Sequence, residues 1–251
     1  HGAAVAPDLG KGFTTNGRAA SMTIFDLKTL KVLGEVHIAP GPDGFLYDPA
    51  TKRAFSFSRS SKNASAVDGG EGKAAGIVDL GGVPEAAAAD GKGKVFVVIQ
   101  DQDRIVKFDA KALTVESSWP VAPSCTQPTS MAIDRDHRRL FVGCRGKQFI
   151  ALNADTGEIL STLPIGQGTD AATFDSDSHL VFISNGEGTI TVIQQESPDK
   201  YTVIDTVKTE EGAKTMGLDM KTHHLFLSTA DRTTPPAPAP GEQPAARVVM
   251  P

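Results

Sequence analysis

Six residues, one in each successive segment of about 42 residues, have the chemical types and the spacing to form a shared polar site. Each lies where the first short apolar strand of its segment would begin, and five of the six are ionisable. They are His1, Asp43, Glu85, Thr129, Asp170 and Lys214. Carboxylates with an imidazole suit a divalent cation such as calcium, zinc or copper, which predicts the metal ligands His1, Asp43, Glu85 and Asp170. Lys214 would supply a counter-charge or bind an anionic substrate.

Two simpler interpretations stand beside this one. Polar groups around a water-filled channel can solvate the channel without binding anything. His1, as a chain terminus, could instead chelate copper alone through its amine and its imidazole.

A second repeated feature predicts the elements that would position these residues. In each segment an aspartate follows small or apolar residues and precedes a turn and an apolar strand. The marker aspartates are Asp8, Asp48, Asp90, Asp134, Asp175 and Asp219. Repeats of about 40–45 residues made of short strands are typical of β-propellers, in which each repeat is one four-stranded blade. The first strands of all blades surround one central channel. The six residues above should therefore converge at its mouth.

We expect a single all-β domain over residues 1–251, with about six four-stranded blades of which the last is incomplete. The approximate blades are 1–42, 43–84, 85–128, 129–169, 170–213 and 214–251. The second blade has a weak third strand at Ser65–Asp68. In the last blade, Thr233–Pro244 reads as a loop and Arg247–Met250 as a third strand, with no fourth strand to follow.

The two cysteines are predicted to pair. Cys125 precedes the first strand of the fourth repeat and Cys144 ends the second, so an antiparallel hairpin would bring both to one end. Two free buried thiols are the alternative. A disulfide would indicate an oxidising compartment.

Several motifs together resemble the YVTN-repeat, YncE-like β-propellers of bacteria. The carriers are Ala4–Asp8 with Gly12–Gly17, Met22–Thr29, Ala132–Asp134 with Arg139–Val142, and Leu152–Gly157. The resemblance covers essentially the whole chain and implies an exported protein with seven blades. Seven blades of this period need roughly 290–300 residues, so the resemblance also implies that this chain is a truncated propeller.

Composition narrows the possible partners. A net charge of −5 argues against nucleic-acid binding, which normally needs a basic face. No apolar run approaches the roughly 18–20 residues that span a bilayer. Because the chain opens inside a predicted strand, any targeting segment is expected upstream of it, and we expect a periplasmic or secreted protein.

Two functional hypotheses follow. The first is an exported, non-catalytic binding or scaffold propeller that uses its channel mouth or its loop face to bind a small molecule or a protein, and whose polar mouth could hold a metal ion. The second is a metal-dependent hydrolase, similar to a lactonase, in which Asp43, Glu85 and Asp170 hold a cation that polarises a carbonyl and activates water. The second rests on analogy between folds. No haem-attachment, Walker or nucleophile-elbow motif occurs in the sequence.

Overall fold

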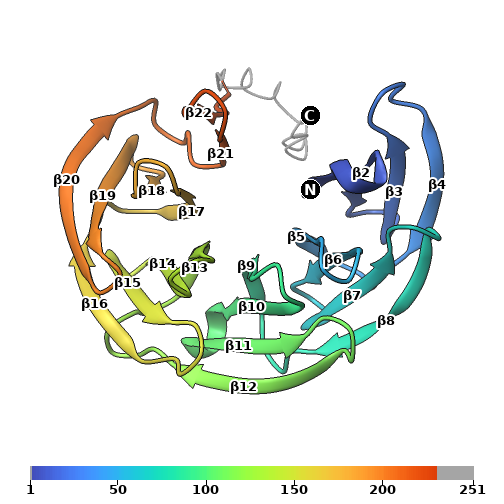
Figure 1. Ribbon diagram of the computed structural model, residues 1–251, viewed down its shortest axis with the longest axis horizontal. Coiled ribbons are helices and arrows are strands. Elements are labelled where there is room, and N and C mark those ends of the chain that lie inside the picture. The colour runs from blue at the N-terminus through green and yellow to red at the C-terminus, as the bar shows by residue number, and fades with distance from the viewer. Residues whose placement is uncertain (1, 231–251) are drawn as a thin grey trace, which may run out of the picture.

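Short antiparallel strands make up almost all the regular structure of residues 2–230, the part of the chain that this computed structural model describes. Hydrogen bonding joins them into five four-stranded sheets and one two-stranded sheet, each built from strands consecutive in sequence. Figure 1 shows these sheets arranged radially around one axis, with the first strand of each nearest the centre. The predicted β-propeller is confirmed, with the sixth sheet incomplete within the described residues.

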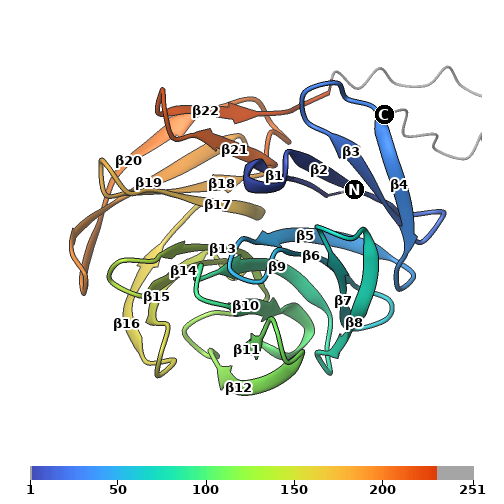
Figure 2. The same cartoon turned by 45° about the vertical axis from the view of Figure 1, so that its right-hand side comes forward.

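The strands of blades 1 to 3 are β1 (Ala3–Ala6), β2 (Lys11–Asn16), β3 (Ser21–Asp26), β4 (Val32–His37), β5 (Pro42–Asp48), β6 (Arg53–Ser58), β7 (Asn63–Asp68), β8 (Lys73–Asp79), β9 (Pro84–Ala89), β10 (Lys94–Ile99), β11 (Arg104–Asp109) and β12 (Thr114–Pro120). Those of blades 4 to 6 are β13 (Pro128–Asp134), β14 (Arg139–Cys144), β15 (Gln148–Asn153), β16 (Ile159–Pro164), β17 (Thr169–Asp175), β18 (Leu180–Asn185), β19 (Thr189–Ser197), β20 (Lys200–Lys208), β21 (Met216–Asp219) and β22 (His224–Leu227). Two single 3-10 turns, η1 (Pro7–Leu9) and η2 (Gln100–Gln102), complete the regular elements of this part of the chain. The outer strands β4, β8, β12, β16 and β20 form the circumference in Figures 1 and 2.

The apolar cores lie between blades, not within them. In β10, Phe96 and Val98 pack toward blade 4, whereas Val95, Val97 and Ile99 pack toward blade 2. Successive side chains of a strand point to opposite faces of its sheet, so a strand covered on both faces needs an unbroken apolar run. The sequence Val95–Ile99 is therefore the signature of a strand shared by two cores.

The marker aspartates connect each blade to the next. Asp134 and Asp175 are almost fully buried, and their carboxylates accept backbone N–H bonds from residues two positions ahead. In four repeats the following blade also donates a side-chain hydrogen bond to the marker aspartate. These pairs are Tyr47 with Asp8 at 2.9 Å, Arg138 with Asp90 at 3.2 Å, Gln195 with Asp134 at 3.0 Å and His223 with Asp175 at 2.8 Å.

The predicted disulfide is present. Cys125 and Cys144 are bonded, their Cα atoms lie 5.6 Å apart, and both are fully buried in the core between blades 3 and 4.

Three expectations need a comment. The third strand of blade 2 is longer than predicted, because Asn63–Asp68 pairs along its whole length with both neighbours. Its alanines and serines carry little apolar signal in the sequence, but Ala64 and Ala66 are buried between blades. His1, the predicted loop Thr233–Pro244 and the predicted strand Arg247–Met250 lie outside the described residues. In residues 2–230, no helix has the length and apolar character to cross a membrane.

Removing the disulfide tests its contribution to stability. The double variant Cys125→Ala/Cys144→Ala opens a loop of 19 residues, and the chain-entropy model gives a loss of about 3 kcal/mol in the free energy of unfolding. Denaturant unfolding of the wild-type protein, with and without a reductant, and of the variant measures this loss. Equal stability of oxidised wild type and variant would contradict the prediction.

The inter-blade aspartates predict a particular dependence of stability on pH. Burial raises the pKa of Asp134, but hydrogen bonds from the His137 backbone, Gln195 and the His137 ring outweigh burial and leave this pKa below its usual 3.8. A carboxylate with a lowered folded-state pKa stabilises the fold above its unfolded pKa, and this stabilisation is lost as the pH falls through the folded pKa. Asp134→Asn should therefore cost about 1–3 kcal/mol at pH 7, and its deficit relative to wild type should shrink progressively below about pH 4.

Unfolding by urea at pH 7, 5, 4 and 3 measures this deficit. The exposed Asp136→Asn, two residues away, is the matched control and should stay within about 0.5 kcal/mol of wild type at every pH. A deficit for Asp134→Asn that is constant from pH 7 to pH 3 would show that the ionised carboxylate is not what stabilises the blades.

Candidate ligand site at the channel mouth

Five of the six residues predicted from the sequence line one cavity. Its volume is about 770 Å³, and its wall includes Asp43, Glu85, Thr129, Asp170 and Lys214, which come from blades 2 to 6. Blade 1 contributes Gly2 and Ala3. The sixth predicted residue, His1, lies outside the described part of the chain. The cavity surrounds the axis at the end of the ring where the inner strands begin, as the repeat predicts.

Irregularities of strand pairing set the direction of these side chains. In β5 the pairing skips Asp43, because Pro42 is opposite Ser58 and Gly44 is opposite Phe57. The pairing of β13 skips Thr129 in the same way. In β9 and β17 the irregularity spans Glu85 and Asp170. Such bulges bend a strand and redirect a side chain, so four blades use one backbone device to present a polar residue to the cavity.

Arg59 neutralises the acidic side of the cavity. It directly follows β6, and its guanidinium contacts Glu85 and lies 3.7 Å from Asp43. The same guanidinium donates a hydrogen bond of 3.0 Å to Gln100. Glu85 belongs to the blade after Arg59, so this ion pair also connects blades 2 and 3. The two carboxylates predicted as metal ligands here therefore already share a cation.

Asp170 is paired as well. Lys214, from the segment that enters blade 6, places its ammonium 2.9 Å from the Asp170 carboxylate. The Lys214 carbonyl in turn accepts a hydrogen bond from the Ser184 hydroxyl. The predicted counter-charge thus acts within the protein, between blades 5 and 6.

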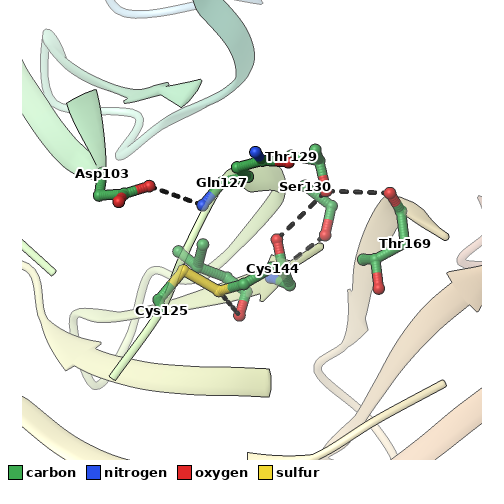
Figure 3. The surroundings of a disulfide bond; sticks show 9 residues. Asp103, Cys125, Gln127, Thr129, Ser130, Cys144 and Thr169 are labelled. Atoms are coloured by element: carbon green, nitrogen blue, oxygen red, sulfur yellow. Dashed lines mark hydrogen bonds between the residues drawn. A yellow bond between two sulfur atoms is a disulfide. The ribbon is translucent and has the colours of Figure 1, made fainter. Parts of the chain in front are cut away.

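Thr129 and its neighbour Ser130 line the cavity and lie near the disulfide (Figure 3). Thr129 is buried, and its hydroxyl donates to the Thr169 carbonyl of blade 5 at 2.9 Å. Ser130 accepts the backbone N–H of Gly143 at 3.2 Å. Both hydroxyls thus have structural partners, and that of Thr129 ties blade 4 to blade 5.

Arg145 is the residue that the sequence analysis missed. It lines the cavity directly after Cys144, and its side chain is exposed. Within residues 2–230, no hydrogen bond or ion pair engages its guanidinium. The sequence did contain a signal for it: Arg145 directly follows the second strand of blade 4, just as Arg59 directly follows the second strand of blade 2.

His137, His179 and His223 lie away from the cavity, in the turns at the far ends of the inner strands of blades 4 to 6. There, donor atoms of Asp175, Asp177 and His223 come within 4.8 Å of one another. Nδ1 of His223 contacts Asp175 at 2.8 Å, which is the inter-blade contact described above. His137 contacts Asp134 in the same manner, also at 2.8 Å. His137 and His223 are thus exposed residues whose rings bond to buried carboxylates of the repeat.

Comparisons with known proteins give the fold and no more. No protein-family model and no curated protein matches the chain. Among solved structures, hydrazine synthase of Kuenenia stuttgartiensis is similar with a TM-score of 0.75 at 17% identity, over 89% of this chain and 71% of that one. A functionally unknown protein from Desulfotomaculum acetoxidans has a TM-score of 0.78 at 15% identity, over 90% of this chain and 78% of that one.

A third solved structure names the architecture in its description. It is the β-propeller domain of Cps50 (Swd1) from Myceliophteria thermophila, with a TM-score of 0.69 at 13% identity, over 82% of this chain and 70% of that one. Identities this low carry no function from one protein to another. The comparisons and the radial sheets agree that this chain has the β-propeller fold.

Proposed function

We propose that this protein is an exported, non-catalytic binding propeller of the YVTN-repeat type, that residues 1–251 form one domain, and that its ligand occupies the cavity at the channel mouth. The observation that carries the proposal is the convergence of Asp43, Glu85, Thr129, Asp170 and Lys214 on one cavity of about 770 Å³. Ligand pockets are usually concave and combine an apolar wall with a few convergent polar groups. Here alanines, Phe45, Met131 and Met216 supply the apolar part of the wall. The size of the cavity suits a small molecule or a single inserted side chain of a partner protein.

The disulfide supports export, because disulfides persist mainly in oxidising compartments. The repeated turn motifs support the family assignment.

The arrangement of charges supports binding rather than catalysis. Two of the three carboxylates share Arg59, and the third is paired with Lys214. A cation at the mouth would have to displace these partners, so the geometry does not favour the hydrolase hypothesis.

Blocking the cavity tests the proposed site. Ala171 lines the mouth, and Ala171→Trp would fill part of the cavity. A defined library of small carboxylates, amines, sugars and nucleosides, screened by thermal shift and confirmed by calorimetry, should yield compounds that bind wild type and bind the variant at least about tenfold more weakly, a loss of about 1.4 kcal/mol.

The control for this screen is Ala50→Trp, an exposed position in the turn at the far end of β5. It should bind every such compound as wild type does. If Ala171→Trp leaves the affinity of all bound compounds unchanged, the mouth is not the site.

Removing Arg59 tests the hydrolase hypothesis. In Arg59→Gln, Glu85 loses its cation, and we expect millimolar calcium to raise the melting temperature of this variant but not that of wild type. Lys62→Gln is the control, because Lys62 pairs with Asp101 and neither residue lines the cavity. Calcium stabilisation of wild type as large as that of Arg59→Gln would support a metal site and with it the hydrolase hypothesis.

A further inference from the structure

One cationic side chain at the mouth, that of Arg145, has no hydrogen-bond or ion-pair partner among residues 2–230. Three carboxylates, those of Asp43, Glu85 and Asp170, line the cavity, and cations contact all of them. Arg59 and Lys214 are used in these contacts. Arg145 lines the same cavity, and in residues 2–230 nothing pairs with its guanidinium. It is the cation available to a ligand among the described residues of the wall.

The repeat explains why Arg145 is available. In blade 2, the residue after the second strand is Arg59, and it contacts Glu85 in the bulge of the next blade. Arg145 has the equivalent place in blade 4, and the equivalent residue of blade 5 is Asp170. Asp170 is instead bound by Lys214 from blade 6. Because Lys214 takes the place that Arg145 would have beside Asp170, the Arg145 guanidinium has no acceptor in the part of the chain that the structure describes.

The backbone beneath Arg145 is held firmly. The residue before it, Cys144, is buried and disulfide-bonded. The N–H of Arg145 donates to the Gln127 carbonyl at 3.0 Å, and the N–H of Gln127 donates to Asp103 at 2.6 Å. Figure 3 shows Gln127 and Thr129 near the disulfide between Cys125 and Cys144. A fixed backbone lowers the entropy lost when the side chain binds a ligand.

The chemistry of the wall limits what Arg145 would bind. A guanidinium presents two parallel N–H groups that match a carboxylate. A doubly charged group such as phosphate would meet one available cation and three nearby carboxylates, so a single negative charge fits better. Ala86, Ala87, Met131, Ala172 and Met216 supply apolar surface for the rest of the ligand. These features describe a monocarboxylate with a short apolar body.

We propose that the ligand of the mouth is such a monocarboxylate, and that Arg145 binds its carboxylate. This inference rests on the proposed function, since it takes the mouth as the binding site.

The test compares acids with neutral compounds of the same shape. Butanoate and benzoate are titrated by calorimetry into wild type, Arg145→Gln and Lys147→Gln, alongside butanamide, benzamide and inorganic phosphate. Lys147 is an exposed cation two residues after Arg145, and it does not line the cavity. Lys147→Gln therefore removes one positive charge, as Arg145→Gln does, but leaves the cavity wall unchanged. Melting temperatures of the three proteins establish that each is folded.

We expect both acids to bind wild type at least about tenfold more tightly than their amides and than phosphate. Arg145→Gln should lose at least about tenfold in affinity for the acids, and Lys147→Gln should stay within about twofold of wild type. Equal affinity for acid and amide, tighter binding of phosphate, no binding of either acid, or full affinity in folded Arg145→Gln would each overturn the proposal.

The two proposals can fail separately. A neutral or cationic library compound that Ala171→Trp excludes and Arg145→Gln does not affect would leave the mouth as the binding site and overturn the carboxylate assignment alone. Acids that bind wild type and Ala171→Trp equally would overturn both.

Discussion

The structure depends on hydrogen bonds to the carboxylate that ends each inner strand. In blades 2 to 6 this carboxylate accepts backbone N–H bonds in the turn that precedes the second strand. In four of the interfaces between described blades, the marker aspartate accepts a side-chain hydrogen bond from the next blade. A buried carboxylate is tolerated only when hydrogen bonds compensate for the loss of water. Asp90, Asp134 and Asp175 thus each shape their own blade and set its orientation to the next one. With that orientation set at one end of the inner strand, the other end has a defined place around the axis.

At that other end, charge pairing decides what the cavity can do. The sequence shows three acidic residues and a lysine, which could equally be a cation site. The structure adds Arg59, and the acidic residues become partners of protein cations. Among the described residues, the cation at the mouth that no protein group engages is then the guanidinium of Arg145, which changes the expected ligand from a metal ion to an anion. The same predicted residues line the cavity, but their chemistry is set by neighbours that the repeat alone did not identify.

Much of this architecture was predictable because it is periodic. The spacing of Asp48, Asp90, Asp134 and Asp175 predicts the blades, and the first residues of the inner strands predict the cavity wall. The pairing of Cys125 with Cys144 follows from one hairpin. Tertiary partners were not predictable in this way, because Arg59 meets Glu85 only when two blades pack together. Arg145 could have been found by aligning the residues that follow each second strand.

The division of β10 between two cores has a consequence for how such a chain can change over generations. Phe96 and Val97 are adjacent in sequence but belong to different interfaces, so a substitution at one exerts little selective pressure on the other. Val97 instead shares its core with Phe55, about forty positions earlier. In a lineage of related propellers, compensating substitutions should therefore appear as covariation at a distance of one repeat, while neighbouring positions drift independently.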